Sequence, residues 1–426
     1  MTIDKIPEKW HDDLAKLEKI AGQQNSTLNL SAIMLSIDMN VEYVDNIINY
    51  FENLGIEVIT TDIEPDASDS TMERLDPFDP SLISIRIVSM TIDTVVKRIE
   101  HNEFEFDSAF QRKAGLWNNT NKSQLIESIL LRVPLPAFYF DASDDNKWLI
   151  IDGLQRVSTL REFIVDKKMK LTGMEFFEDL NGLKYDALPR PMQRRIAETN
   201  IVAYIVDPMT PSNAKFSIFK RINTGGLVLS SQEIRNALYQ GKATEFLSKL
   251  AKSDVFLLVT GGSIPSDRML DREFCLRFVA FNYLPIDLYN GVIDDFLNLA
   301  MEELNKASEM YLNRIYCVFE AVLQICYAIF GEHAFRKMSS DGRKRPINKG
   351  LFETWTHVIR QSQKSHYILM RNADIVVDKF ISLCTEHQFY VALRDSHPSA
   401  IRKRIELIDD MLREVVEHGG DNTNDN

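Results

Sequence analysis

Residues 147–160 read KWLIIDGLQRVSTL, and this stretch decides the fold of the middle of the chain. Its apolar run WLII has the length and the β-branched content of a buried strand. Gly153 allows a sharp turn, and apolar residues at helical spacing follow it. The pattern therefore predicts a strand, a turn and the start of a helix, with Asp152, Gln155 and Arg156 gathered at the junction.

An acid, an amide and an arginine at such a junction suit the phosphates of a nucleotide. The free N–H groups at the start of a helix and the guanidinium of Arg156 can hold an anion, and Asp152 can hold Mg²⁺. The structural alternative is that Asp152 caps the helix and Arg156 pairs with a surface carboxylate. Because short motifs recur by chance, the neighbouring segments must decide between the two interpretations.

Three further segments extend the pattern on both sides of this stretch. They are FQRKAGLW from Phe110, QLIESILLRVPLPAFYF from Gln124 and FKRINTGGLVLSSQEIRNALYQG from Phe219. Together with DGLQR, residues 81–241 resemble the family typified by the N-terminal half of the GmrSD modification-dependent restriction enzymes. That family has a DGQQR motif and is a branch of the ParB and sulfiredoxin-like superfamily. The resemblance implies an α+β fold, a ParB/sulfiredoxin-like mixed domain.

The resemblance also implies a nucleoside triphosphate and Mg²⁺ as cofactors. It gives catalytic roles to Asp152, Gln155 and Arg156, with Asp152 as the metal ligand and Gln155 next to a water or the nucleotide. It implies nucleotide contacts from five further residues, which are Gln111, Arg112, Gly153, Arg221 and Asn223. Leu154 stands where the motif has its first glutamine. If that glutamine orients an attacking water, hydrolysis is in doubt here, and nucleotide binding less so.

The flanking residues have structural interpretations as well. Arg112 can form a surface salt bridge. Helical spacing after Pro211 places Arg221 and Asn223 at a helix C-terminus, where the backbone dipoles repel anions, so Asn223 can equally serve as an ordinary helix-end residue. The pattern SSQE that ends at Glu233 predicts a capping box, which makes Glu233 structural.

The charge of the chain is concentrated at its N-terminus. The net charge is −13 over 426 residues, and residues 1–80 hold 17 acids and five lysines or arginines, a balance of −12. Residues 1–63 predict an acidic helical module that resembles region 1.1 of bacterial primary sigma factors; the alternative is an accessory three-helix domain with a solvated acidic face. Residues 64–81 predict an acidic linker. This charge argues against a dominant non-specific grip on DNA.

The middle domain, residues 82–241, is predicted to alternate strands and helices. The predicted strands lie within 83–92 and at 137–141, 147–152 and 200–206, and the predicted helices lie at 91–101, 125–130, 157–165, 192–198 and before Gly225. A polar turn between the second and third strands predicts a hairpin. The hairpin would deliver Asp152 to the end of a strand.

The C-terminal part, residues 242–418, shows helical spacing and almost no convincing strand, which predicts an all-α domain followed by a disordered tail at 419–426. No metal ligands surround His387 or His397, as a His-Asn-His nuclease centre would require. Four cysteines without a C-x-x-C pair predict neither a disulfide nor a zinc site. No apolar run reaches about 20 residues and no signal peptide is evident, which predicts a cytoplasmic protein without membrane contact.

The function predicted from these observations is nucleotide binding, with hydrolysis as an open question, in a prokaryotic or phage system that senses or restricts foreign DNA. One alternative is a non-catalytic adaptor whose contacts with DNA or protein depend on nucleotide. Another is a transcription-linked regulator that acts through the sigma-like module on RNA polymerase. The partners to expect are a nucleotide, DNA, and a nuclease, methyltransferase or polymerase.

Overall fold

The computed structural model describes residues 83–106, 117–144, 146–222 and 229–420. Before residue 60 it describes residues 14, 15, 17, 27–29, 50, 51, 54 and 57–59 alone. There, β1 (Thr27–Asn29) and β2 (Glu57–Ile59) pair in parallel. The helical module, its likeness to a sigma factor and the linker at 64–81 otherwise lie outside the described residues, as do residues 421–426.

A five-stranded mixed sheet forms the centre of the middle domain, and its order is β3-β7-β5-β6-β4. β3 runs antiparallel to β7, β7 parallel to β5, β5 antiparallel to β6 and β6 parallel to β4. The strands are β3 (Ile85–Thr91), β4 (Phe104–Glu105), β5 (Phe138–Asp141), β6 (Trp148–Asp152) and β7 (Asn200–Val206). The predicted hairpin is confirmed, because β5 and β6 are antiparallel neighbours joined by the polar turn.

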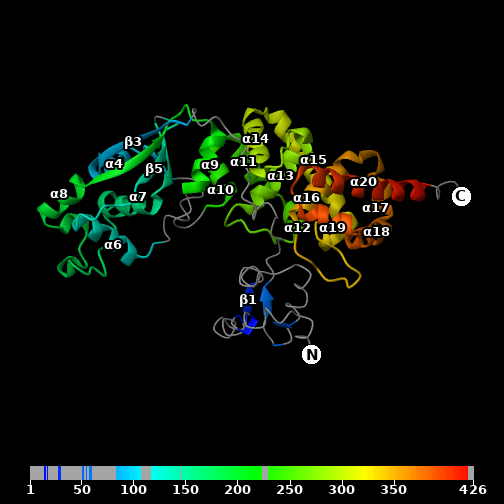
Figure 1. Cartoon of the computed structure of the whole chain (residues 1–426), viewed down its shortest axis with the longest axis horizontal. Helices are drawn as coiled ribbons and strands as arrows, with labels where there is room; N and C mark the ends of the chain where they lie inside the picture. Colours follow the sequence, from blue (N-terminus) through cyan, green and yellow to red (C-terminus); the bar gives the residue numbers. More distant parts are fainter. Residues whose placement is uncertain are drawn as a thin grey trace.

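Most helices of this domain cover one face of the sheet, where they enclose its main core (Figure 1). They are α4 (Ile92–Glu100), α6 (Asn119–Leu130), α7 (Leu154–Leu160), the π-helical η6 (Arg161–Val165) and α8 (Arg190–Glu198), with short 3₁₀ turns η7 (Glu178–Leu180) and η8 (Tyr185–Ala187). α4 shows why these segments are helical. Thr91 caps its first turn through Thr94 N–H at 3.3 Å, and its apolar stripe is buried.

The opposite face of the sheet is partly covered by α9 (Ser212–Ile222) and α10 (Ser231–Leu238). Phe216, Phe219 and Ile234 of these helices pack on Ile151 and Val206 of the sheet. The predicted capping box at the start of α10 is confirmed: Ser230 N–H donates to Glu233 at 2.7 Å, and Glu233 N–H donates to Ser230 Oγ at 3.2 Å. Glu233 is therefore structural, as predicted.

The C-terminal part is all-α, as predicted, and builds one large apolar core. Its helices are α11 (Lys242–Ala251), α12 (Asp254–Thr260), α13 (Leu270–Tyr283), α14 (Ile293–Lys306), α15 (Glu309–Phe330), α16 (Lys349–Gln361), α17 (His366–Arg371), α18 (Ala373–Thr385), α19 (His387–Arg394) and α20 (Pro398–Gly420). Figure 1 shows α9 and α10 between this helical domain and the sheet. α20 extends two residues into the tail that was expected to begin at residue 419.

One detail differs from the sequence-based expectations. The stretch Glu309–His333 is long and apolar enough to cross a bilayer, although the apolar stripe of α15 packs into the helical core.

Among the cysteines, Cys275 and Cys326 are buried core residues. Cys317 is exposed, and Cys384 is half-buried against the same core.

Candidate functional site

The turn after β6 requires glycine at its first position. Gly153 has φ +97°, which is left-handed backbone, and a Cβ built there would lie 2.6 Å from Cδ1 of Phe138. A side chain would therefore be strained by the backbone and would also collide with an aromatic ring. Gly153 brings the start of α7 against the beginning of β5.

Arg156 lies inside this corner, and its side chain is bonded within the protein. The residue is 8% exposed. Its guanidinium donates to the carbonyl oxygen of Pro136, to that of Ala137 at 3.2 Å and to Oδ2 of Asp152 at 2.8 Å. It also stacks over the ring of Phe138, with Cζ 4.2 Å from the ring centroid. Burial lowers the pKa of Arg156, and Asp152 opposes that shift.

Asp152 faces the solvent at the end of β6. Its side chain is 40% exposed, and Oδ2 accepts the bond from Arg156. It does not cap α7, because Gly153 is the N-cap and no side chain caps this helix. The structural alternative for Asp152, a helix cap, is therefore wrong, and the carboxylate is held by Arg156 instead.

Two stacked tyrosines adjoin Asp152 on the face of the sheet that α9 and α10 partly cover, and Tyr139 packs against the apolar cluster of these helices. Tyr139 lies opposite Asp152 on one side and opposite Tyr204 on the other. The two rings are nearly parallel, with centroids 4.8 Å apart. Burial, Tyr204 and Asp152 together raise the pKa of Tyr139. The carboxylate thus stands beside a neutral aromatic surface.

Gln155 and Leu154 occupy the first turn of α7. Gln155 is half-buried, and its backbone carbonyl accepts a bond from Thr159 Oγ1 at 2.7 Å. Leu154 packs against the main core of the sheet domain. The helix then widens into η6, where Asp166 N–H donates to Arg161 O at 2.8 Å. π-helical turns often lie next to functional sites.

The structure brings together four of the residues predicted from the sequence: Asp152, Gly153, Gln155 and Arg156. Gln111, Arg112 and Asn223 lie outside the described residues. Arg221 is exposed in the last turn of α9. Its predicted contact with a nucleotide stays a prediction.

Sequence reasoning missed Phe138, Tyr139 and Tyr204, although FYF and NIVAYIV were both recognised as strands. The alternation of those strands indicated which residues share a face, but not which strands are neighbours. β5 and β7 are 58 or more residues apart along the chain, so their adjacent tyrosines were beyond a local pattern.

A second polar cluster lies at the other end of β5. Lys215 of α9 lies 3.2 Å from Oδ1 of Asp141, and Ser143 donates to the same carboxylate oxygen and accepts from Lys215. Lys215 and Asp141 are both buried. This cluster anchors α9 on the sheet.

The corner offers one half-exposed carboxylate to a cation. Mg²⁺ commonly uses one or two carboxylates together with substrate phosphates and water, so this donor set fits an ion that phosphate helps to hold. Within the described ranges, no three His, Cys, Asp or Glu side chains lie close enough together to bind a metal. Asp152 could therefore hold such an ion only together with phosphate and water.

Comparisons with known proteins give a family match in one region of the chain. Residues 92–240 match the family model described as the GmrSD restriction endonuclease, N-terminal domain. No curated protein and no solved structure matches the chain. The matched range contains the whole Asp152 corner and ends within two residues of α10.

Proposed function

Because residues 92–240 form a domain of the GmrSD N-terminal family, we propose that this protein binds a nucleotide at the Asp152 corner and acts in a restriction or defence system. The observation that carries the proposal is the half-exposed Asp152 carboxylate, which a buried arginine holds at a turn that only glycine fits. The proposed role in restriction or defence rests on the family match alone. The proposed binding of a nucleotide rests on this geometry together with the family resemblance.

The residues of the corner have distinct roles in this proposal. Asp152 presents its carboxylate to a magnesium ion, and that ion would neutralise charge on the phosphates. Arg156 is a positioning residue, because all the bonds described for its guanidinium end on the protein. A direct contact between Arg156 and phosphate would require those bonds to break. The stacked tyrosines border the site.

Leu154 supports binding without rapid hydrolysis, which is the second candidate function. Its side chain packs on the core and has no group that can orient a water. A site of this kind can hold a nucleotide long enough for the nucleotide to control contacts with DNA or protein. The adaptor interpretation therefore shares the same corner, and the transcription-linked interpretation would depend on residues outside the described ones.

Titration of fluorescent ATP, GTP and CTP in the presence and absence of Mg²⁺ tests the proposal. Asp152→Asn should weaken Mg²⁺-dependent binding of one nucleotide by about tenfold, because a neutral amide is a poorer ligand for a hard cation. Asp166→Asn is the matched control, since Asp166 is 30% exposed and also lies near an arginine, Arg161, at 3.9 Å. Equal affinities in all three proteins would remove the nucleotide site from this corner.

A further inference from the structure

β3 forms one edge of the sheet that the described strands build. Among the described strands, β7 alone pairs with it. The strand is seven residues long, reads IRIVSMT and contains no proline. Natural proteins usually protect a long edge strand with charges, proline or a covering element, because its free backbone groups can pair with another chain. Arg86 is the only charged residue of β3.

The hydrogen-bonding phase of β3 can be read from its two ends. Asp207 N–H donates to Ser84 O at 2.9 Å, and Ile92 N–H donates to Thr199 O at 3.0 Å. In an antiparallel ladder every second residue exchanges bonds with its partner. The even-numbered residues of β3 therefore bond to β7, and the backbone groups of Ile85, Ile87 and Ser89 point outward from the sheet.

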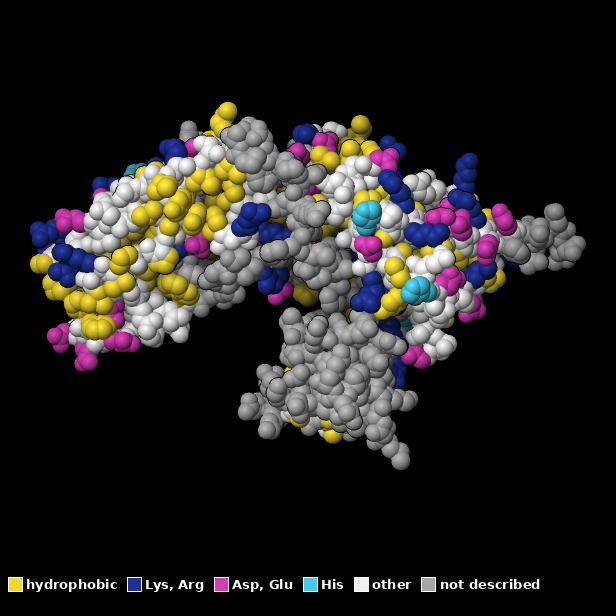
Figure 2. Space-filling view, viewed as in Figure 1, with side chains coloured by type: hydrophobic (Ala, Val, Ile, Leu, Met, Phe, Trp, Pro, Cys, Tyr) yellow, Lys and Arg dark blue, Asp and Glu magenta, His cyan; other side chains and the backbone are white. Residues whose placement is uncertain are grey.

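Two of the three residues with outward backbone groups also carry exposed apolar side chains. Ile87 is 68% exposed and Ile85 is 37% exposed. Figure 2 shows hydrophobic side chains gathered over the sheet domain, on the face that the view presents. Apolar side chains beside a free ladder of N–H and C=O groups are the pattern of a strand that accepts another strand.

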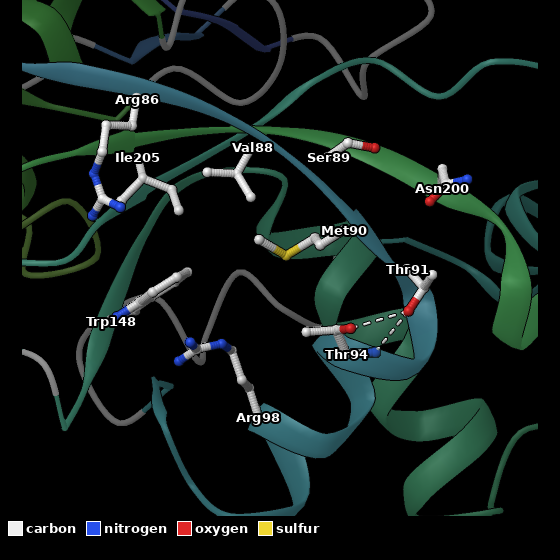
Figure 3. A pocket seen from close by; sticks show the side chains of 10 residues that line it. All are labelled: Arg86, Val88, Ser89, Met90, Thr91, Thr94, Arg98, Trp148, Asn200 and Ile205. Carbon is white, nitrogen blue, oxygen red and sulfur yellow. Dashed lines mark hydrogen bonds between the residues drawn. The ribbon is translucent and has the colours of Figure 1, made fainter.

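The face of β3 opposite Ile85 and Ile87 borders an open pocket of about 510 Å³ (Figure 3). Val88 and Met90 line it from β3, and Thr94 and Arg98 line it from α4. Arg98 stacks on Trp148 at one end, with Cζ 3.8 Å from the ring centroid. A strand added to β3 would therefore find room for alternate side chains on this face.

The geometry points to a second copy of this chain as the partner, with β3 paired antiparallel to β3 of the other copy about a two-fold axis at Val88. Ile87 then lies opposite Ser89 of the second copy and exchanges backbone bonds with it, and Ile85 lies opposite Thr91. The outward backbone groups of both strands are satisfied at once. The two five-stranded sheets become one continuous sheet.

The charge pattern favours this register of self-pairing over a register that would place the two Arg86 side chains opposite each other. With the axis at Val88, Arg86 lies opposite Met90 of the second copy, so the two arginines stay apart. Asp207 holds Arg86 at 2.6 Å within its own chain, so no carboxylate is required from the partner. The isoleucines of both edges lie on the same face of the joined sheet. An isologous contact of this kind closes on itself as a dimer.

Light scattering coupled to gel filtration, over a range of protein concentration, tests the dimer. Ile87→Pro removes an outward N–H and spares every bond to β7, so β3 keeps its place in the sheet. Because the change acts twice in a two-fold dimer, the dissociation constant should rise about a hundredfold, roughly tenfold for each lost bond and contact. Ile87→Lys should act in the same direction by placing a charge at the edge.

The control is Val202→Lys. Val202 is 42% exposed, and it lies on the same face as Ile87 but on β7, which has a neighbour on both sides. It should leave the dimer intact. A wild-type chain that stays monomeric at every concentration, or a dimer that survives both Ile87 variants, would overturn the proposal.

A disulfide tests the register itself. In a chain that carries Cys317→Ser to remove an exposed thiol, Val88→Cys should form an intermolecular disulfide on mild oxidation, because residues on the two-fold axis form a close, non-hydrogen-bonded pair with Cα atoms about 4.5 Å apart. Ile85→Cys in the same chain should not cross-link, since it faces Thr91. Cross-linking at position 85 and not at 88 would show that the register is wrong.

Discussion

Two arginine–aspartate pairs, one within the sheet domain and one between that domain and the C-terminal helices, differ in how far the solvent reaches them. In the pair Arg156–Asp152 the side chains are 10% and 40% exposed, whereas in Arg235–Asp294 they are 1% and 4% exposed. The first joins residues four apart along the chain, and the second joins α10 to α14. Both arginines are buried, so the two pairs differ in whether a ligand from solution can reach the acid.

The pair Arg235–Asp294 belongs to a network that is closed to ligands. Nε of Arg235 donates to Asn298 at 3.1 Å, Nη1 donates to Gln232 at 3.1 Å, and Nη2 bonds Asp294. Lys220 reaches the other oxygen of Asp294 at 2.8 Å. Burial would raise the pKa of Asp294, but Arg235 and Lys220 outweigh burial and lower it. The network orders the two halves of the molecule and leaves no half-exposed carboxylate.

The largest expected effect is that of breaking the closed pair. Arg235→Met leaves Asp294 buried with only a half-exposed lysine as partner, and it should lower the free energy of unfolding by about 3–5 kcal/mol. Lys220→Met removes a lysine whose side chain is 47% exposed and should cost less than about 1 kcal/mol. Urea unfolding followed by circular dichroism measures both. Similar losses of unfolding free energy in the two variants would contradict the contrast between the buried Arg235 and the half-exposed Lys220.

The next effect concerns the turn at the open corner. Gly153→Ala should lower the free energy of unfolding by about 2–4 kcal/mol, because left-handed backbone and an overpacked contact each add a cost. Gly182→Ala is the control: its φ is +83°, but a Cβ there would meet no atom within 4 Å. It should cost about 1–2 kcal/mol. Thermal unfolding of both variants would show whether the contact with Phe138 adds to the backbone cost.

A smaller loss is expected on acidification, and it should come from the helical domain. Burial alone would raise the pKa of Glu273, but Lys349 and nearby arginines outweigh burial and lower it. A carboxylate with a depressed folded pKa stabilises the fold above its unfolded pKa, and that contribution is lost as the pH falls through the folded pKa. The urea midpoint should therefore fall progressively below about pH 4.5. Glu273→Gln should flatten that dependence, and an unchanged slope would contradict it.

Substitution of Leu154 should have the smallest effect on stability. Its effect is instead expected on the rate of nucleotide hydrolysis. Leu154→Gln should raise nucleotide hydrolysis by about tenfold with little change in binding, because orienting a water acts on the transition state. Leu154→Met keeps the packing without adding an amide and should leave the rate unchanged. Phosphate release under single-turnover conditions gives the rates. A wild-type rate already equal to that of Leu154→Gln would show that this position does not limit hydrolysis.

The fold could be predicted from sequence wherever neighbouring residues determine it. The strand, Gly153 and the helix after it follow from local periodicity, and the capping box at Ser230 follows from side-chain chemistry. The sheet order does not, because β3 and β7 pair over more than a hundred residues of intervening chain. Long-range order of this kind depends on which apolar faces meet, and a single sequence does not record that.

The candidate site, like the fold, could be predicted from sequence only in part. The pattern of strand, glycine turn and helix predicts that Asp152 and Arg156 gather at one junction. It does not predict that Arg156 points inward, because its other acceptors, Pro136 and Ala137, come from the segment before β5. Arg235 and Asp294 are 59 residues apart, so their pairing was equally beyond a motif. Contacts between residues close in sequence can be predicted from the sequence, whereas contacts between distant segments cannot.

The carboxylate of Asp294 has a consequence for where one folding unit ends. The family match stops at residue 240, yet Arg235 and Lys220 within it find their counter-charge on α14. A boundary drawn after α10 would cut through a single electrostatic cluster and leave its cations without their shared anion. We therefore expect the folding unit to extend beyond the matched range, so that heat melts the sheet domain and the first helices of the C-terminal domain in one cooperative transition.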